Sequence, residues 1–261
     1  MRGGIDVNLF NSVTIMRLQT LSEKEAHQVV DQLYSRVLAR GEEKITRGRF
    51  MTRLAEGQLD QESLKTFWLN WTRFVSEINN FAQVAYQRHL GFFLDHLDLM
   101  TPFADKVADE LIHPRPPGHL LLVWRQGEVF GLSREQMVHY PMLPACRGML
   151  DFARGLLYEG TMIEFWSSFA AEEYVGHWAR AFRLGLKRMG YTEDQLVYFK
   201  THEEADLVEH QGVMGHGQFN RAVLTRLLTR GKTHFRPGYS LEYCADTAID
   251  LYALFVDRCA I

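Results

Sequence analysis

The most informative part of the sequence lies at residues 198–210, which read YFKTHEEADLVEH. On a helix that turns about 100° per residue, the side chains of His202, Asp206 and Glu209 fall within about 60° of one another, and His210 lies about 80° from His202. One face of this helix can therefore offer imidazole and carboxylate groups to a single cation. The pattern is short and can arise by chance, so it indicates a metal site only together with candidate ligands elsewhere in the chain.

The composition is that of a globular protein. The chain has 261 residues, 46% of them hydrophobic, which is enough for a substantial core in one large domain or two small ones. A net charge of −3 and a pI near 6.4 provide no basic surface for nucleic acid. No window approaches the roughly 18 apolar residues of a membrane span, and no signal-peptide pattern is present. The three cysteines are odd in number and widely spaced, which favours reduced thiols over disulfides or a zinc site. We therefore expect a cytoplasmic protein with no nucleic-acid or membrane partner.

Helical periodicity runs through most of the chain, and no alternating strand pattern or phosphate-binding glycine motif interrupts it. Capping boxes mark three helix starts, at Ser22 with Glu25, Ser133 with Gln136, and Thr192 with Gln195. We expect an arm at residues 1–20 and a single all-α domain of about seven or eight helices at 21–261. The clearest helices are expected at about 22–38, 60–89, 102–112, 145–157, 160–189, 192–210, 219–228 and 240–259.

The expected helix at 160–189 is apolar on nearly every side, so it should be central. Its carboxylates Glu164, Glu172 and Glu173 are anomalous there, because burying a carboxylate without a partner costs several kcal/mol. Glu172 could bind a metal, or it could form a buried ion pair with Arg180 or Arg183 on the same expected helix. Glu173 could likewise pair with His177, which lies four residues later.

Carboxylates and imidazoles that converge from separate helices are what a dinuclear iron site needs. A ferritin-like bundle would carry two E-x-x-H motifs, but only Glu110 to His113 matches. Because His113 directly precedes Pro114, we favour His119 as the ligand and keep His113 as an alternate. The candidate metal ligands are Glu110, His119, Glu172, His202, Asp206 and His210, with Glu209, Glu173 and His113 as alternates. Of these, Glu110, Glu172, His202 and Asp206 are the candidate catalytic residues.

This order of acid, His, acid and a His/Asp/His helix resembles the heme-oxygenase-like diiron oxidases and oxygenases, whose fold is shared by TenA-type thiaminases and pyrroloquinoline quinone synthase. In that family the first Glu and His straddle a junction between helices, as Glu110 and His119 do. Glu172 precedes His202 by thirty residues, a family spacing. The resemblance covers roughly residues 45–259. It implies a heme-oxygenase-like bundle, two ferrous ions with manganese as an alternative, and O2 as co-substrate.

One position departs from the family pattern, in which the second imidazole of the last ligand helix would fall on Glu209. Either Glu209 replaces that imidazole, or a local π-bulge turns His210 inward. We favour His210.

The resemblance implies an oxidase or oxygenase that acts on a small substrate in specialised metabolism, an amino acid or amine before a fatty acid. An external electron donor and a homodimer are compatible with this interpretation. The alternatives are a fatty-acid oxidative decarboxylase, a metal-free pyrroloquinoline quinone synthase-like or thiaminase-like enzyme, and a helical binding module without catalysis. Thiaminase chemistry in this fold needs a cysteine nucleophile, and Cys146 is poorly placed for it. The candidate substrate pocket comprises Trp68, Trp71, Arg73, Phe74, Trp124 and Trp166, with Arg73 or Arg147 as a clamp for a carboxylate.

Overall fold

The computed structural model describes residues 20–113, 115–207, 215–230 and 233–261, and these residues form an all-α structure. The arm expected at residues 1–20 falls almost entirely outside this part of the chain. The α-helices are α1 (Glu23–Gly41), α2 (Arg49–Ala55), α3 (Gln61–Leu94), α4 (Leu97–Leu111), α5 (His119–Val129), α6 (Arg134–His139), α7 (Pro144–Tyr158), α8 (Met162–Ser168), α9 (Ala171–Arg188), α10 (Val197–Leu207), α11 (His216–Arg230) and α12 (Leu241–Arg258).

The expected number of seven or eight helices was too low, even for the part of the chain that is described. The segment expected as one helix at 160–189 is divided into α8 and α9 at Phe169 and Ala170. Just before this division, the hydroxyls of Ser167 and Ser168 donate to the backbone carbonyls of Ile163 and Phe165. Such hydroxyl bonds compete with the backbone hydrogen bonds of a helix and often bend it. Periodicity alone does not reveal this break, because the apolar pattern continues through it.

The three capping boxes are confirmed. Ser22 caps α1 and Ser133 caps α6 as expected, because each hydroxyl accepts a hydrogen bond from the backbone N–H three residues on. Thr192 instead caps a single 3-10 turn at Glu193–Gln195, and α10 begins after it.

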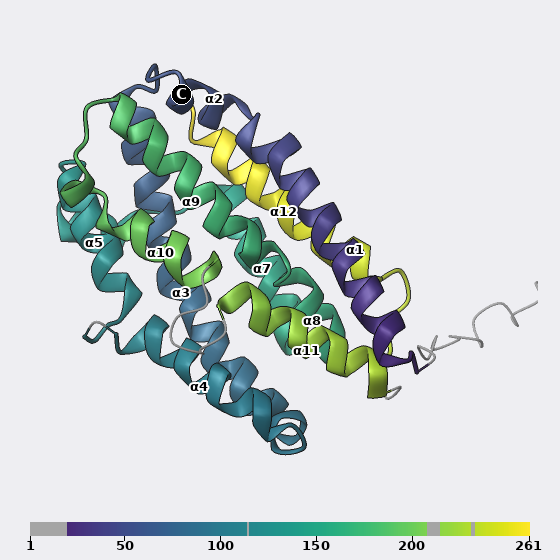
Figure 1. The fold of residues 1–261 in the computed structure, drawn as a ribbon. Helices are drawn as coiled ribbons and strands as arrows, with labels where there is room; N and C mark the ends of the chain where they lie inside the picture. Colours follow the sequence, from purple (N-terminus) through teal and green to yellow (C-terminus); the bar gives the residue numbers. More distant parts are fainter. Residues whose placement is uncertain (1–19, 114, 208–214, 231–232) are drawn as a thin grey trace, which may run out of the picture.

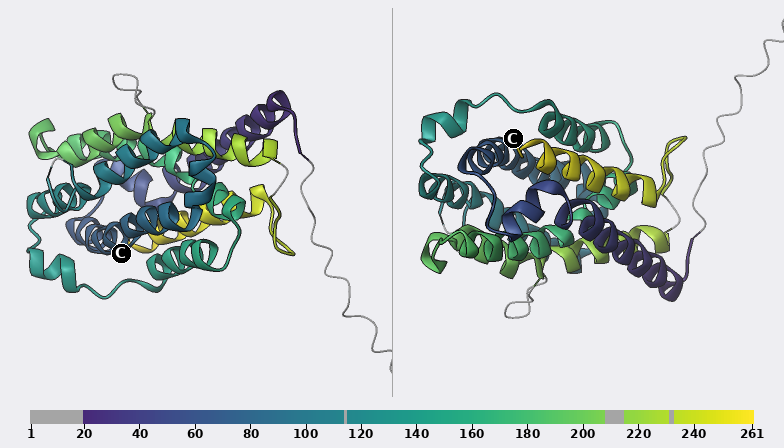
Figure 2. Two further views of the ribbon diagram at one scale, coloured as in Figure 1. Left: turned by 90° about the horizontal axis from the view of Figure 1, so that it is seen from below. Right: turned by 90° about the horizontal axis from the view of Figure 1, so that it is seen from above.

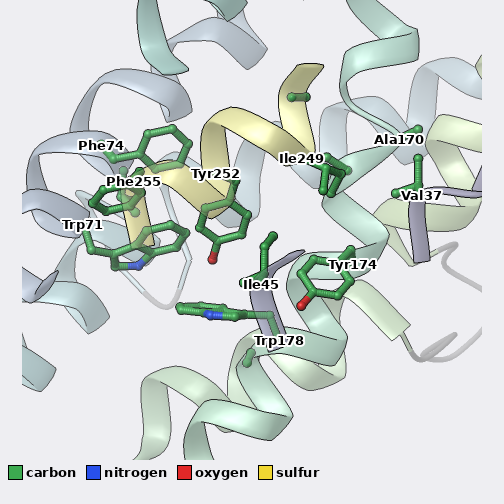
Figure 3. Packing of buried hydrophobic residues seen from close by; sticks show 14 of the residues in the cluster. Val37, Ile45, Trp71, Phe74, Ala170, Tyr174, Trp178, Ile249, Tyr252 and Phe255 are labelled. Atoms are coloured by element: carbon green, nitrogen blue, oxygen red, sulfur yellow. The ribbon is translucent and has the colours of Figure 1, made fainter. Parts of the chain in front are cut away.

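The helices pack side by side around an aromatic core. Figure 1 shows α1 and α12 along one edge of the molecule and α9 across its middle, and α9 contacts α1, α2, α10, α11 and α12. Both views in Figure 2 place the yellow α12 between the teal α7 and the purple α1. In Figure 3 the rings of Trp71, Trp178 and Tyr252 gather around one space, with ring centroids 5.1 to 5.9 Å apart. None of the described helices has both the length and the apolar character needed to cross a membrane.

The anomalous carboxylate of Glu164 has a structural explanation. Its side chain is fully buried and accepts hydrogen bonds from the backbone N–H and the guanidinium of Arg236, at 2.6 and 2.7 Å. It also accepts from the backbone N–H of Thr161 at the start of α8. These donors compensate for the lost hydration of the carboxylate, so Glu164 ties the chain before α12 to α8.

Candidate metal centre

Five helices bring carboxylates and imidazoles close to one another, and three of these side chains line a shared cavity. Glu110 lies near the end of α4, His119 at the start of α5, Glu172 in the first turn of α9, His202 in α10 and His216 at the start of α11. The pairs α4 with α5, α4 with α11, α9 with α10 and α9 with α11 are in direct contact. The site therefore depends on tertiary packing and not on one helical face.

Glu110 and His119 meet because Gly118 lets the chain turn back sharply. Gly118 has φ 66° and ψ −138°, a conformation that other residues rarely adopt. A Cβ atom at Gly118 would lie 2.3 Å from the backbone oxygen of Glu110, so the two segments approach as closely as glycine allows. As a result Nδ1 of His119 lies 3.3 Å from Oε2 of Glu110.

We expect Gly118→Ala to reduce the free energy of unfolding by about 2 kcal/mol, because it adds both backbone strain and a backbone clash. The control is Gly148→Ala in α7, where a Cβ atom would meet open space. That control should stabilise the protein by about 0.5–1 kcal/mol, since alanine replaces glycine inside a helix. Urea unfolding measures both effects, and a neutral Gly118→Ala would show that this junction relaxes freely.

Glu110, Glu172 and His216 each offer a ligand atom, and these atoms all lie within 4.8 Å of one another. Nδ1 of His216 is 3.6 Å from Oε1 of Glu172, and Nε2 of His216 is 3.8 Å from Oδ2 of Asp109. The imidazole is thus flanked by carboxylates on both sides, an arrangement that typically orients metal-bound histidines. Two carboxylates and an imidazole are suitable donors for ferrous iron or manganese, so these residues fit the group that the sequence predicts.

His202 adds a neutral imidazole beside this cluster. Its ring centroid is 4.9 Å from that of His119, and its Nδ1 is 3.0 Å from the carbonyl oxygen of Tyr198. Because a carbonyl only accepts, the proton belongs on Nδ1, and Nε2 keeps the lone pair that a metal requires. Burial, reinforced by the charge of His119, lowers the pKa of His202 to about 3. His202 is therefore uncharged at neutral pH.

The carboxylates of the cluster are ionised at neutral pH. Burial raises the pKa of Glu110, but the charge and hydrogen bond of His119 and the charges of His216 and His202 outweigh it and lower that pKa to about 2. Burial also raises the pKa of Glu172, yet Lys106 and His216 hold it far below its usual range. The Glu110 carboxylate in turn raises the pKa of His119, although burial alone would lower it. The site is thus supplied with anionic oxygens before any metal binds.

The cluster borders a largely apolar cavity of about 140 Å³. Lys106, Glu110, Glu172 and His202 line one part of it. The rest of its wall consists mainly of apolar side chains, including Trp71, Phe74, Val75, Ile78, Met149 and Phe152. An occupant would need an apolar body and a polar group directed at the carboxylates.

The remaining candidate ligands lie elsewhere or outside the described residues. Glu173 forms a bidentate pair with Arg221, at 2.7 and 2.9 Å, instead of joining the cluster. His113 is exposed beyond the end of α4. The backbone of Asp206 belongs to α10, but its side chain lies outside the described part of the chain, as do Glu209 and His210. The assignment of the last ligand remains a prediction.

Of the six pocket residues expected from the sequence, the structure brings Trp71 and Phe74 to the cavity. Trp68 is core, with its indole N–H bonded to the carbonyl of Val123. Trp124 lies under the guanidinium of Arg134, and Trp166 packs in the core against Phe103 and Phe219.

The two arginines suggested as clamps also have other partners. Arg73 donates to the carbonyl of Val138 and lies 3.7 Å from Glu77. Arg147 makes two hydrogen bonds to the same glutamate, at 2.8 and 2.9 Å. Neither arginine is among the residues that line the cavity.

Three residues of the site were missed by the sequence analysis, namely Lys106, His216 and Asn220. The amide of Asn220 donates to Oε2 of Glu172 at 2.6 Å, and the Lys106 ammonium donates to the same oxygen. His216 and Asn220 are four residues apart and share one helical face, but that spacing alone does not identify a metal ligand. Lys106 likewise precedes Glu110 by one turn on α4.

Comparisons with known proteins support the fold. No protein-family model and no curated protein matches the sequence. A TenA homologue from Pseudomonas syringae pv. tomato matches with a TM-score of 0.65 and 13% identity, over 92% of this chain and 97% of that one. A domain of unknown function with a heme oxygenase-like fold from Shewanella denitrificans matches with a TM-score of 0.59 and 12% identity, over 92% of this chain and 93% of that one. A TenA homologue from P. horikoshii matches with a TM-score of 0.54 and 12% identity, over 90% of this chain and 96% of that one. The chain therefore has the heme-oxygenase-like fold, as the sequence resemblance predicts.

Proposed function

We propose that this chain is a non-heme iron, O2-dependent oxidoreductase that oxidises a small amphipathic molecule. The observation that carries the proposal is the group of Glu110, Glu172 and His216, with His119 and His202 beside it, at the border of a largely apolar cavity. Carboxylates stabilise ferric iron, while neutral imidazoles limit the negative charge at the site. Bound iron would supply the reduction of O2.

The chain's own residues would bind the iron and position the substrate. Glu110, Glu172 and His216 would hold the ion, and His202 would present the lone pair of Nε2. The apolar wall formed by Trp71, Phe74 and neighbouring side chains would bind the body of the substrate and exclude water. The reacting group would then face the carboxylates. An amino acid or amine is the first substrate class to test and a fatty acid is the second.

A thiaminase-like covalent mechanism receives less support from the same cavity. Such a mechanism needs a cysteine thiolate, and none of the described residues that line the cavity is a cysteine. Cys146 is fully buried, its thiol lies 3.7 Å from the backbone oxygen of Asn70, and burial raises its pKa to about 12. A thiol in this environment stays protonated and a poor nucleophile.

The test is anaerobic loading with ferrous iron, metal analysis, and measurement of O2 uptake with panels of amino acids, amines and fatty acids. We expect iron to bind and one substrate class to accelerate O2 uptake. Glu110→Gln should abolish that acceleration, whereas His113→Ala, which changes an exposed histidine nearby, should preserve it. The proposal is wrong if no iron binds, or if bound iron consumes O2 equally with and without every candidate substrate.

A further inference from the structure

A buried lysine lies within the candidate metal centre. Lys106 is only 4% exposed, and its ammonium group donates to Oε2 of Glu172 and lies 3.5 Å from Oδ1 of Asn220. Removing an ammonium group from water is costly, so a lysine is retained in such a place only with a partner. Glu172 is that partner. A positive charge is therefore built into the wall of the cavity, next to the metal-binding carboxylates.

The two oxygens of Glu172 have different neighbours. Oε1 faces His216 at 3.6 Å and belongs with the donors of the candidate metal cluster. Oε2 accepts hydrogen bonds from Lys106 and from Asn220. In a dinuclear site, a bridging carboxylate gives one oxygen to each metal ion. Here the second oxygen is already bonded to an ammonium group.

We propose that Lys106 takes the place of a second metal ion, so that this centre binds one divalent cation and Lys106 determines that number. The inference deepens the proposed function and rests on it, because it assumes that the cluster around Glu110, Glu172 and His216 binds a metal.

Two physical effects support this role. The ammonium repels a second dication through a medium of low dielectric constant, where like charges interact strongly. It also withdraws a carboxylate oxygen from coordination by hydrogen bonding to it. The number of donor groups does not restrict the centre to one ion. His119 and His202 lie close to Glu110 and add two imidazoles to the three clustered residues. Within the described part of the chain, the donor withheld from a second ion is Oε2 of Glu172, which accepts from Lys106.

The experiment compares manganese binding to the unaltered 261-residue chain and to Lys106→Met, whose side chain has a similar length and no charge. Stoichiometry is measured by metal analysis after equilibrium dialysis, and the spin coupling of bound Mn²⁺ is measured by electron paramagnetic resonance. We expect one isolated Mn²⁺ in the natural chain. We expect two exchange-coupled ions in Lys106→Met, with affinity for the second ion raised more than about tenfold.

Two further variants keep the test decisive if Lys106→Met folds poorly. Lys106→Leu, like Lys106→Met, removes both the charge and the hydrogen bond to Glu172, so it should also gain a second ion. Lys106→Arg keeps the charge and should bind one ion only. Circular dichroism and gel filtration without metal identify the variants that are folded and can be compared.

The outcomes separate this inference from the proposed function. One ion in the natural chain and one in both folded neutral variants overturns the role of Lys106 and leaves the metal site standing. Two tightly bound ions in the natural chain likewise overturn the role of Lys106 alone. Failure of the natural chain and all variants to bind manganese or iron overturns the proposed function together with the inference.

Discussion

Replacing Glu172 by leucine is expected to lower the free energy of unfolding of the metal-free protein by about 3–5 kcal/mol. The change removes the carboxylate that pairs with Lys106, which is almost fully buried. A buried ammonium group without a partner lowers the free energy of unfolding by far more than the burial of the leucine side chain raises it. Asn220 also loses the acceptor of its 2.6 Å hydrogen bond. Urea unfolding in the presence of a chelator measures the loss.

The double variant Lys106→Met/Glu172→Leu should recover most of that stability, because removing both charges leaves no ion buried without its partner. Asp98→Ala provides a control on α4, the helix that carries Lys106. Its pair with Arg226 is half exposed, at 48% and 57%, so its loss should cost less than about 1 kcal/mol. If the double variant were as unstable as the sum of the two single changes, Lys106 and Glu172 would be energetically independent, contrary to their geometry.

Local sequence patterns predicted the all-α class, the starts of α1 and α6 and most of the long helices, because caps and periodicity act within a few turns. The spacing of Glu110, His119, Glu172 and His202, together with the family resemblance, also placed these four residues in one centre, and the structure brings them together. The Glu110–His119 pair could be predicted because the two residues flank one short junction between helices, where Gly118 permits the close approach.

His216 was not predicted, since its role arises only when α11 packs against α4 and α9. In the sequence it follows a glycine-rich break and resembles the start of an ordinary helix. Lys106 was missed for a different reason, because a search for metal ligands does not count ammonium groups. The π-bulge that would turn His210 inward is a prediction about residues outside the described part of the chain.

His216→Ala is expected to weaken ferrous or manganese binding by more than about a hundredfold. Losing a residue that only orients a ligand typically costs 10- to 100-fold, and His216 is one of the three clustered donors themselves. Competition with a fluorescent chelator, performed anaerobically for iron, measures the affinity. His177→Ala in α9 and His113→Ala after α4 are matched controls, because both histidines are exposed, and each should stay within about twofold of the natural chain.

His202→Ala and Asp206→Ala extend the same measurement to α10. If the imidazole of His202 coordinates the ion through Nε2, its removal should weaken binding by at least about tenfold without exposing a buried charge, because the ring is neutral at its depressed pKa. A similar loss in Asp206→Ala would add that carboxylate to the centre. Equal affinities for His216→Ala and His113→Ala would instead show that His216 is not a ligand of the metal.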